Sequence, residues 1–122
     1  MKKVSSVAGG YLRNMMSENA EEGAVMNIQE IKETISPIAM RYGVSKVLLF
    51  GSRARGEARP DSDYDFLISK GKVDNLWLQI AFTDELEDAL MAHVDVVTDT
   101  SSNVALISNA RQEGILLYEQ KG

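Results

Sequence analysis

The stretch LLFGSRARGEARPDSDYDFLI, residues 48–68, decides both the fold and the expected chemistry of this 122-residue chain. Its first letters complete the segment VSKVLLF at 44–50, which is short, apolar and partly β-branched, and therefore predicts a buried strand. Residues 51–62 are polar and predict a loop with room for a turn of helix. Residues 63–69 predict a second strand, so two strands are expected to meet at a polar loop.

Helices and strands are expected to alternate on both sides of this stretch. Apolar residues three and four positions apart predict an amphipathic helix that begins at Asn27 and ends at Gly43. Pro37 lies within it and is expected to kink or divide the helix. The C-terminal half predicts a helix that begins at Asp74 or Asn75 and ends near Leu90, a strand at 93–98, a helix from Ser101 or Ser102 to about Arg111, and a strand at 115–118. The alternation predicts an α/β (α+β) fold, with helices packed around a small sheet.

The helix predicted to end near Leu90 carries apolar residues at helical spacing. Those expected to point inward are Leu76, Ile80, Thr83, Leu86 and Leu90. Trp77 is expected in the core or on a partner surface rather than as a platform for a nucleotide base.

Gly51 and Ser52 directly follow the first predicted strand. Glycine lets the backbone turn sharply and lets a ligand approach closely. A helix that starts here would offer free N–H groups to an anion such as a triphosphate, and the Ser52 hydroxyl could cap that helix or contact a phosphate oxygen. Because Gly-Ser pairs are common in plain turns, this interpretation depends on the residues that follow.

Asp63 and Asp65 are separated by one residue at the start of the second predicted strand. Side chains two positions apart in a strand point to the same face, so both carboxylates are expected on the face opposite Tyr64 and Phe66. Two like charges about 5 Å apart repel by roughly 3 kcal/mol at an effective dielectric near 20. A divalent cation reverses that energy, and hard oxygen ligands suit Mg²⁺.

Asp95 interrupts the apolar strand pattern HVDVV at 93–97. It is expected on the face opposite Val94 and Val96, where an unpaired carboxylate is costly to bury. If this strand lies beside the one carrying Asp63 and Asp65, the three acids form a two-metal site for phosphoryl or nucleotidyl transfer. Asp95 would then also accept the proton of an attacking hydroxyl. The simpler alternative is an edge-strand aspartate in a turn contact. His93, the one histidine of the chain, is interpreted as a structural residue near this site.

Composition and charge restrict the partners. The chain has a net charge of -5 and 13 basic against 18 acidic residues, which disfavours a long nucleic acid as partner. It has no cysteine, as expected of a cytoplasmic protein, and no apolar run long enough to predict a membrane segment. Residues 1–26 fall outside the regular pattern and are interpreted as an extension, either flexible or docking on a partner or a second copy. Residues 27–122 are interpreted as one domain.

The spaced motif resembles that of the DNA polymerase β superfamily of nucleotidyltransferases. Gly51-Ser52, a spacer at 53–62, Asp63-Tyr64-Asp65 and the later Asp95 stand where that superfamily has Gly-Ser, Asp-x-Asp and a third aspartate. The stretch looks especially like the minimal nucleotidyltransferase (MNT) proteins, small domains often encoded beside a HEPN-domain ribonuclease toxin. The resemblance covers about residues 27–120 and implies a small mixed sheet flanked by helices.

The resemblance also implies roles for individual residues. Gly51 and Ser52 would hold the triphosphate of ATP, while Asp63, Asp65 and Asp95 would bind two Mg²⁺ ions. Arg53, Arg55 and Arg59 lie in the motif loop, where one of them is expected to contact phosphate. Their alternative role is charge balance beside nearby acids.

Similar MNT proteins are antitoxins that transfer AMP from ATP to a tyrosine of the HEPN toxin, and the resemblance implies that activity here, in a homo- or hetero-oligomer. Two alternatives stay open. One is a non-catalytic antitoxin that neutralises the toxin by binding alone. The other is a nucleotidyltransferase acting on a small hydroxylated molecule.

Overall fold

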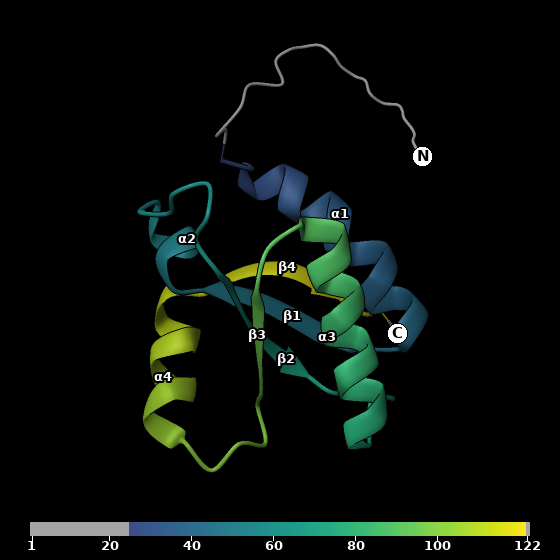
Figure 1. Ribbon diagram of the computed structural model, residues 1–122. Coiled ribbons are helices and arrows are strands. Elements are labelled where there is room, and N and C mark those ends of the chain that lie inside the picture. The colour runs from purple at the N-terminus through teal and green to yellow at the C-terminus, as the bar shows by residue number, and fades with distance from the viewer. Residues whose placement is uncertain (1–24, 122) are drawn as a thin grey trace, which may run out of the picture.

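The computed structural model describes residues 25–121, so the extension predicted at residues 1–26 lies outside the described residues except for its last two. Four helices and four strands alternate along the chain (Figure 1). In order they are α1 (Ile28–Tyr42), β1 (Lys46–Phe50), α2 (Ser52–Arg55), β2 (Tyr64–Ser69), α3 (Leu76–Leu90), β3 (Val94–Thr98), α4 (Val104–Glu113) and β4 (Ile115–Glu119). The α/β prediction is confirmed.

The four strands form one mixed sheet in the order β3-β2-β1-β4. β1 pairs antiparallel with β2 and with β4, whereas β2 pairs parallel with β3. The β2–β3 connection is α3, the kind of helical crossover that a parallel pair requires. β3 is therefore an edge strand, and its neighbour is the strand that follows the Gly51-Ser52 turn.

The two faces of the sheet pack against different helices. Alternate strand residues such as Leu49, Phe66 and Val94 point into the larger core with α1 and α3. The opposite face packs Phe50 and Leu67 against α4. In Figure 1, α4 lies on one side of the sheet and α1 and α3 lie on the other.

α1 forms one continuous helix despite Pro37. The Asn27 side chain accepts a hydrogen bond from the Glu30 N–H, and Glu30 returns one to the Asn27 N–H, which is a capping box. Gly43 ends the helix in the left-handed conformation. Pro37 has no N–H to donate to the Glu33 carbonyl. Both residues are exposed, so water can replace the lost hydrogen bond. The expected division of the helix is therefore absent.

α3 buries a different face from the one the pattern predicted. Leu86 and Leu90 are buried as expected, together with Phe82. Leu76 and Ile80 were predicted to point inward, and this prediction is wrong because both are exposed. Both side chains instead line an open cavity between α3 and the start of β3, the edge strand.

No helix in residues 25–121 has both the length and the apolar composition needed to cross a membrane.

Candidate functional site

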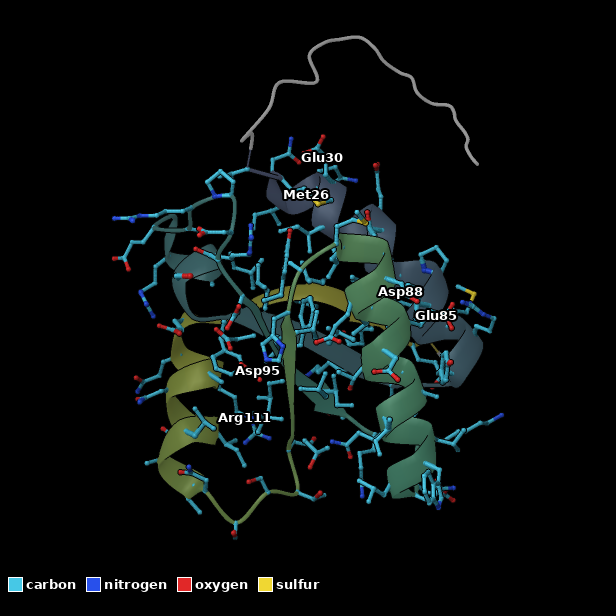
Figure 2. All side chains as sticks on the ribbon, in the orientation of Figure 1. Met26, Glu30, Glu85, Asp88, Asp95 and Arg111 are labelled. Atoms are coloured by element: carbon cyan, nitrogen blue, oxygen red, sulfur yellow. The ribbon has the colours of Figure 1, made fainter. Side chains whose placement is uncertain are left out.

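Three aspartates meet on one face of the sheet at neighbouring strand starts. Asp65 lies in β2 and pairs in register with Asp95 of parallel β3, while Asp63 immediately precedes β2. The strand adjacency on which the three-carboxylate prediction depended is therefore present. β3 is also the edge strand that the simpler alternative required, so Asp95 is open to solvent on its outer side (Figure 2).

Asp63, His93 and Asp95 form a group that could hold a cation. One ligand atom from each lies within 4.8 Å of the other two, and all three residues are exposed. Asp65 stands beside Asp95 on the same face. The site thus contains the three predicted carboxylates and, in addition, an imidazole nitrogen.

The electrostatics of Asp65 favour a bound cation. Its pKa is raised above the ordinary value, chiefly because burial disfavours its charge and also because Asp95 and Asp63 repel it. A divalent ion among these groups would offset both effects. Carboxylate oxygens that leave room for water and phosphate are the donors that Mg²⁺ prefers, so the residues present fit this ion.

His93 is held between two acids. Its Nε2 lies 3.0 Å from Asp95 Oδ1, and its Nδ1 lies 3.1 Å from Glu87 Oε2. The same Glu87 oxygen accepts a hydrogen bond from the Val94 N–H at 3.0 Å. The hydrogen bond to Asp95 is the main reason that the pKa of His93 is raised. Sequence reasoning placed this histidine near the site but missed that Glu87 orients its ring.

The Gly51-Ser52 turn packs closely against the Asp65 side chain. Gly51 has φ 77° and ψ -157°, a conformation that glycine adopts readily and other residues do not. A Cβ atom at this position would collide with Asp65 Oδ2. The absence of a side chain thus brings the backbone of the turn into direct contact with the carboxylate group.

Two backbone donors of the turn are available to a ligand. The Ala54 and Arg55 N–H groups both bond to the Gly51 carbonyl at 3.1 Å. Within residues 25–121, the N–H groups of Ser52 and Arg53 and the Ser52 hydroxyl make no such bond. Gly51 and Ser52 are partly exposed beside Asp65, as phosphate oxygens would require.

Arg53 is buried and holds the loop that leads to β2. Its guanidinium donates to the Ser62 carbonyl at 2.6 Å and lies 3.7 Å from the centre of the Tyr64 ring. Weaker hydrogen bonds reach the carbonyls of Arg59 and Pro60. These contacts give Arg53 a structural explanation that does not involve phosphate.

The other two motif arginines are exposed. Arg55 pairs with Glu57 at 2.9 Å and with Glu113 at 3.1 Å. In the part of the chain that the structure describes, the Arg59 guanidinium makes no ion pair. Of the three, Arg59 therefore has the side chain most available to an anionic ligand.

Glu113, at the end of α4, contacts the turn from the other side. Its carboxylate accepts a hydrogen bond from the Gly51 N–H at 2.7 Å, and this bond is the main reason that its pKa is lowered. Glu113 and Arg55 also line a cavity of about 410 Å³ beside Gly51. Sequence analysis missed Glu113, because nothing in the local pattern links it to a turn 62 positions earlier.

Comparison with known proteins supports the same chemistry. A family model described as "Polymerase beta, Nucleotidyltransferase" matches residues 33–122, a range that contains the turn and all three aspartates.

Two curated relatives align with this chain over almost the whole of their own length. The chain is 38% identical over 90 residues to MJ0435 of Methanocaldococcus jannaschii, provisionally named a protein adenylyltransferase, covering 74% of this chain and 97% of the relative. It is 30% identical over 94 residues to protein adenylyltransferase MntA of Thermococcus cleftensis, covering 74% and 95%.

Solved structures share the fold. A toxin–antitoxin crystal structure with AMP-PNP superposes with a TM-score of 0.65 at 21% identity, over 74% of each chain. A complex of the tri-AMPylated HEPN toxin of Shewanella oneidensis with its MNT antitoxin superposes with a TM-score of 0.61 at 19% identity, over 76% of this chain and 73% of that one.

Proposed function

Because the chain belongs to the polymerase β nucleotidyltransferase family, we propose that it transfers AMP from Mg²⁺-bound ATP to a tyrosine of a HEPN-domain toxin and so acts as an antitoxin. The family assignment confirms the sequence prediction of a nucleotidyltransferase enzyme. The observation that carries the finer proposal is the meeting of Asp63, Asp65 and Asp95 beside a turn with unbonded N–H groups.

In this proposal the turn binds the triphosphate. The Ser52 and Arg53 N–H groups and the Ser52 hydroxyl donate to phosphate oxygens, and Arg59 adds a positive charge from the loop. Asp63, Asp65 and Asp95 hold the cations, and His93, whose ring nitrogens contact Asp95 and Glu87, orients Asp95. Bound Mg²⁺ would neutralise the triphosphate and orient its α-phosphorus.

The transfer step needs a base for the acceptor hydroxyl. Asp95 stands on the open edge of the sheet, where an incoming tyrosine has access. It accepts the phenolic proton as the phenolic oxygen forms a bond to the α-phosphorus and the bond from that phosphorus to the β-phosphate oxygen breaks. Pyrophosphate leaves and the tyrosine carries AMP.

The choice of a protein acceptor draws on the relatives. Those that cover most of this chain are named protein adenylyltransferases, and one neighbouring structure contains an AMPylated HEPN toxin. A tyrosine as the acceptor residue follows from the family resemblance.

The test is incubation of the purified chain with ATP, Mg²⁺ and the HEPN protein encoded with it, followed by intact-mass and peptide mass spectrometry. We expect the HEPN protein to gain AMP on tyrosine and to lose ribonuclease activity. Asp65→Asn should abolish the mass gain. Neutralisation of the toxin by Asp65→Asn without any mass gain would instead establish the non-catalytic alternative. A HEPN protein that is neither modified nor neutralised would overturn the proposal.

A further inference from the structure

The first half of α3 presents apolar side chains to solvent. Leu76 is 66% exposed, Trp77 79% and Ile80 44%. Exposed apolar side chains scattered singly are ordinary, but three on adjacent turns of one helix form a continuous patch. The helical repeat places them opposite Phe82 and Leu86, which are buried in the core.

The same face of α3 becomes acidic one turn later. Asp84 follows Ile80 by four positions and Asp88 follows by four more, so both extend the stripe, and both are exposed. Figure 2 labels Asp88 on α3. We call Leu76, Trp77, Ile80, Asp84 and Asp88 the α3 surface. It contains no basic residue.

A groove connects this surface to the candidate active site. A cavity of about 260 Å³ lies between α3 and the start of β3, and its lining includes Leu76, Ile80, Asp84, Glu87 and His93. His93 in turn contacts Asp95. A polypeptide seated in the groove would therefore lie next to the carboxylate proposed to accept the proton.

We propose that the α3 surface is the docking site of the acceptor protein, which would present apolar side chains flanked by lysine or arginine. This inference rests on the proposed function and adds to it the surface that selects the substrate. The apolar half of the surface loses its contact with water when the acceptor binds, which favours binding, and Trp77 is the expected anchor residue. The acidic half selects basic flanks and orients the acceptor so that its hydroxyl reaches the edge of β3.

Charge complementarity favours this occupant over a second copy of the chain. A symmetric contact would bring two α3 surfaces together, each with Asp84 and Asp88 and without a cation to pair them. The whole chain carries a net charge of -5, which adds to the repulsion between copies.

The test measures binding of the full chain to the HEPN protein encoded with it by isothermal titration calorimetry, without nucleotide. Trp77→Ala and Ile80→Ser should each weaken binding at least about tenfold, as expected of anchor residues in an interface. Asp84→Lys with Asp88→Lys should weaken it and reduce its salt dependence. Val104→Ser on α4 is the matched control, since Val104 is 74% exposed and α4 packs on the face of the sheet opposite α3. It should bind within about twofold of the parent chain.

The replaced side chains are exposed, so thermal unfolding should change little, which separates docking from folding. The proposal would be overturned if Trp77→Ala and Ile80→Ser bound the HEPN protein with the same affinity as Val104→Ser. It would also be overturned if the parent chain did not bind. Loss of self-association in Trp77→Ala, measured by sedimentation with partner binding intact, would assign the surface to a second copy.

Separate measurement of AMP transfer distinguishes this inference from the proposed function. A parent chain that binds through the α3 surface but transfers no AMP would refute the activity and keep the docking site. Equal AMP transfer by the parent chain and by Trp77→Ala would refute the docking site and keep the activity.

Discussion

The backbone N–H of Gly51 donates a 2.7 Å hydrogen bond to the carboxylate of Glu113. This bond links the end of α4 to the turn whose other side touches Asp65. Arg55, which donates to the same carboxylate, completes the link. Glu113 therefore fixes the position of the turn relative to the carboxylates without itself lying among them.

Glu113→Ala should impair nucleotide binding more than chemistry. Without an acceptor for Gly51 N–H the turn loosens, and we expect the KM for ATP to rise by about tenfold, the equivalent of one lost hydrogen bond to a charged group. Glu113→Gln keeps an oxygen for Gly51 and should recover most of the loss. Steady-state kinetics of AMP transfer checks this. Equal defects in Glu113→Ala and Glu113→Gln would show that the charge, and not the hydrogen bond, is what matters.

The same carboxylate gives the protein a defined acid response. Because the pKa of Glu113 is lowered in the folded state, mainly by the Gly51 N–H, its ionised form stabilises the fold. That contribution is complete above the ordinary value of 4.5 and is lost as the pH falls through the lower folded-state pKa. Thermal unfolding from neutral to acidic pH should therefore show the parent chain and Glu113→Gln converging at low pH. A constant difference between them would contradict this linkage.

Gly51→Ala should cost more than Gly56→Ala. Gly56, at φ 76° and ψ 21°, is in the left-handed helical region, where alanine costs about 1 kcal/mol, whereas Gly51, at φ 77° and ψ -157°, is in a region that essentially only glycine adopts. A Cβ at Gly56 meets nothing within 4 Å, whereas one at Gly51 collides with Asp65. We expect denaturant unfolding to show a further loss of about 1–3 kcal/mol for Gly51→Ala, together with loss of AMP transfer. Similar stabilities for the two variants would contradict both the strain at Gly51 and its collision with Asp65.

The sequence predicts the fold well, because apolar spacing and capping residues are local. Asn27 begins α1 and Gly43 ends it, as the pattern indicates. Gly51, Asp65 and Asp95 could be identified as candidate site residues from the local sequence. Gly51 marks a sharp turn after a strand, and the two aspartates interrupt apolar strand patterns.

What the sequence does not predict depends on contacts between distant segments. The spacing of Leu76 and Ile80 indicates an amphipathic helix but does not reveal that these two residues stay exposed beside the edge strand. Glu113 and Glu87 gain their roles from α4 and α3 packing beside Gly51 and His93. The exposure of Leu76 and Ile80 and the roles of Glu113 and Glu87 depend on neighbours that are distant in the sequence, and no local pattern encodes these neighbours.

Arg53 and Arg59 should have opposite effects on stability and binding. Arg53→Ala removes partly buried hydrogen bonds to loop carbonyls and the contact with Tyr64, so unfolding free energy should fall by about 2–3 kcal/mol. Arg59→Ala removes an exposed cation and should change stability by no more than about 0.5 kcal/mol. If Arg59 contacts phosphate, the latter variant should instead weaken ATP binding several-fold. Calorimetric titration with Mg²⁺ and a non-hydrolysable ATP analogue checks this, and unchanged affinity would remove Arg59 from the site.

Asp65→Asn should stabilise the cation-free protein and abolish its response to Mg²⁺. The carboxylate is half-buried and repelled by Asp95 and Asp63, so its removal relieves an unfavourable interaction when no cation is present. In the parent chain, Mg²⁺ binding to the folded state should raise the free energy of unfolding by RT ln(1 + [Mg²⁺]/Kd), so the melting temperature should rise with Mg²⁺ concentration. We expect Asp65→Asn to melt higher than the parent chain in chelator and to gain nothing from added Mg²⁺. Asp61→Asn, an exposed loop aspartate, is the matched control and should respond to Mg²⁺ as the parent chain does. Equal Mg²⁺ responses in all three proteins would place the cation elsewhere and remove the basis of the proposed site.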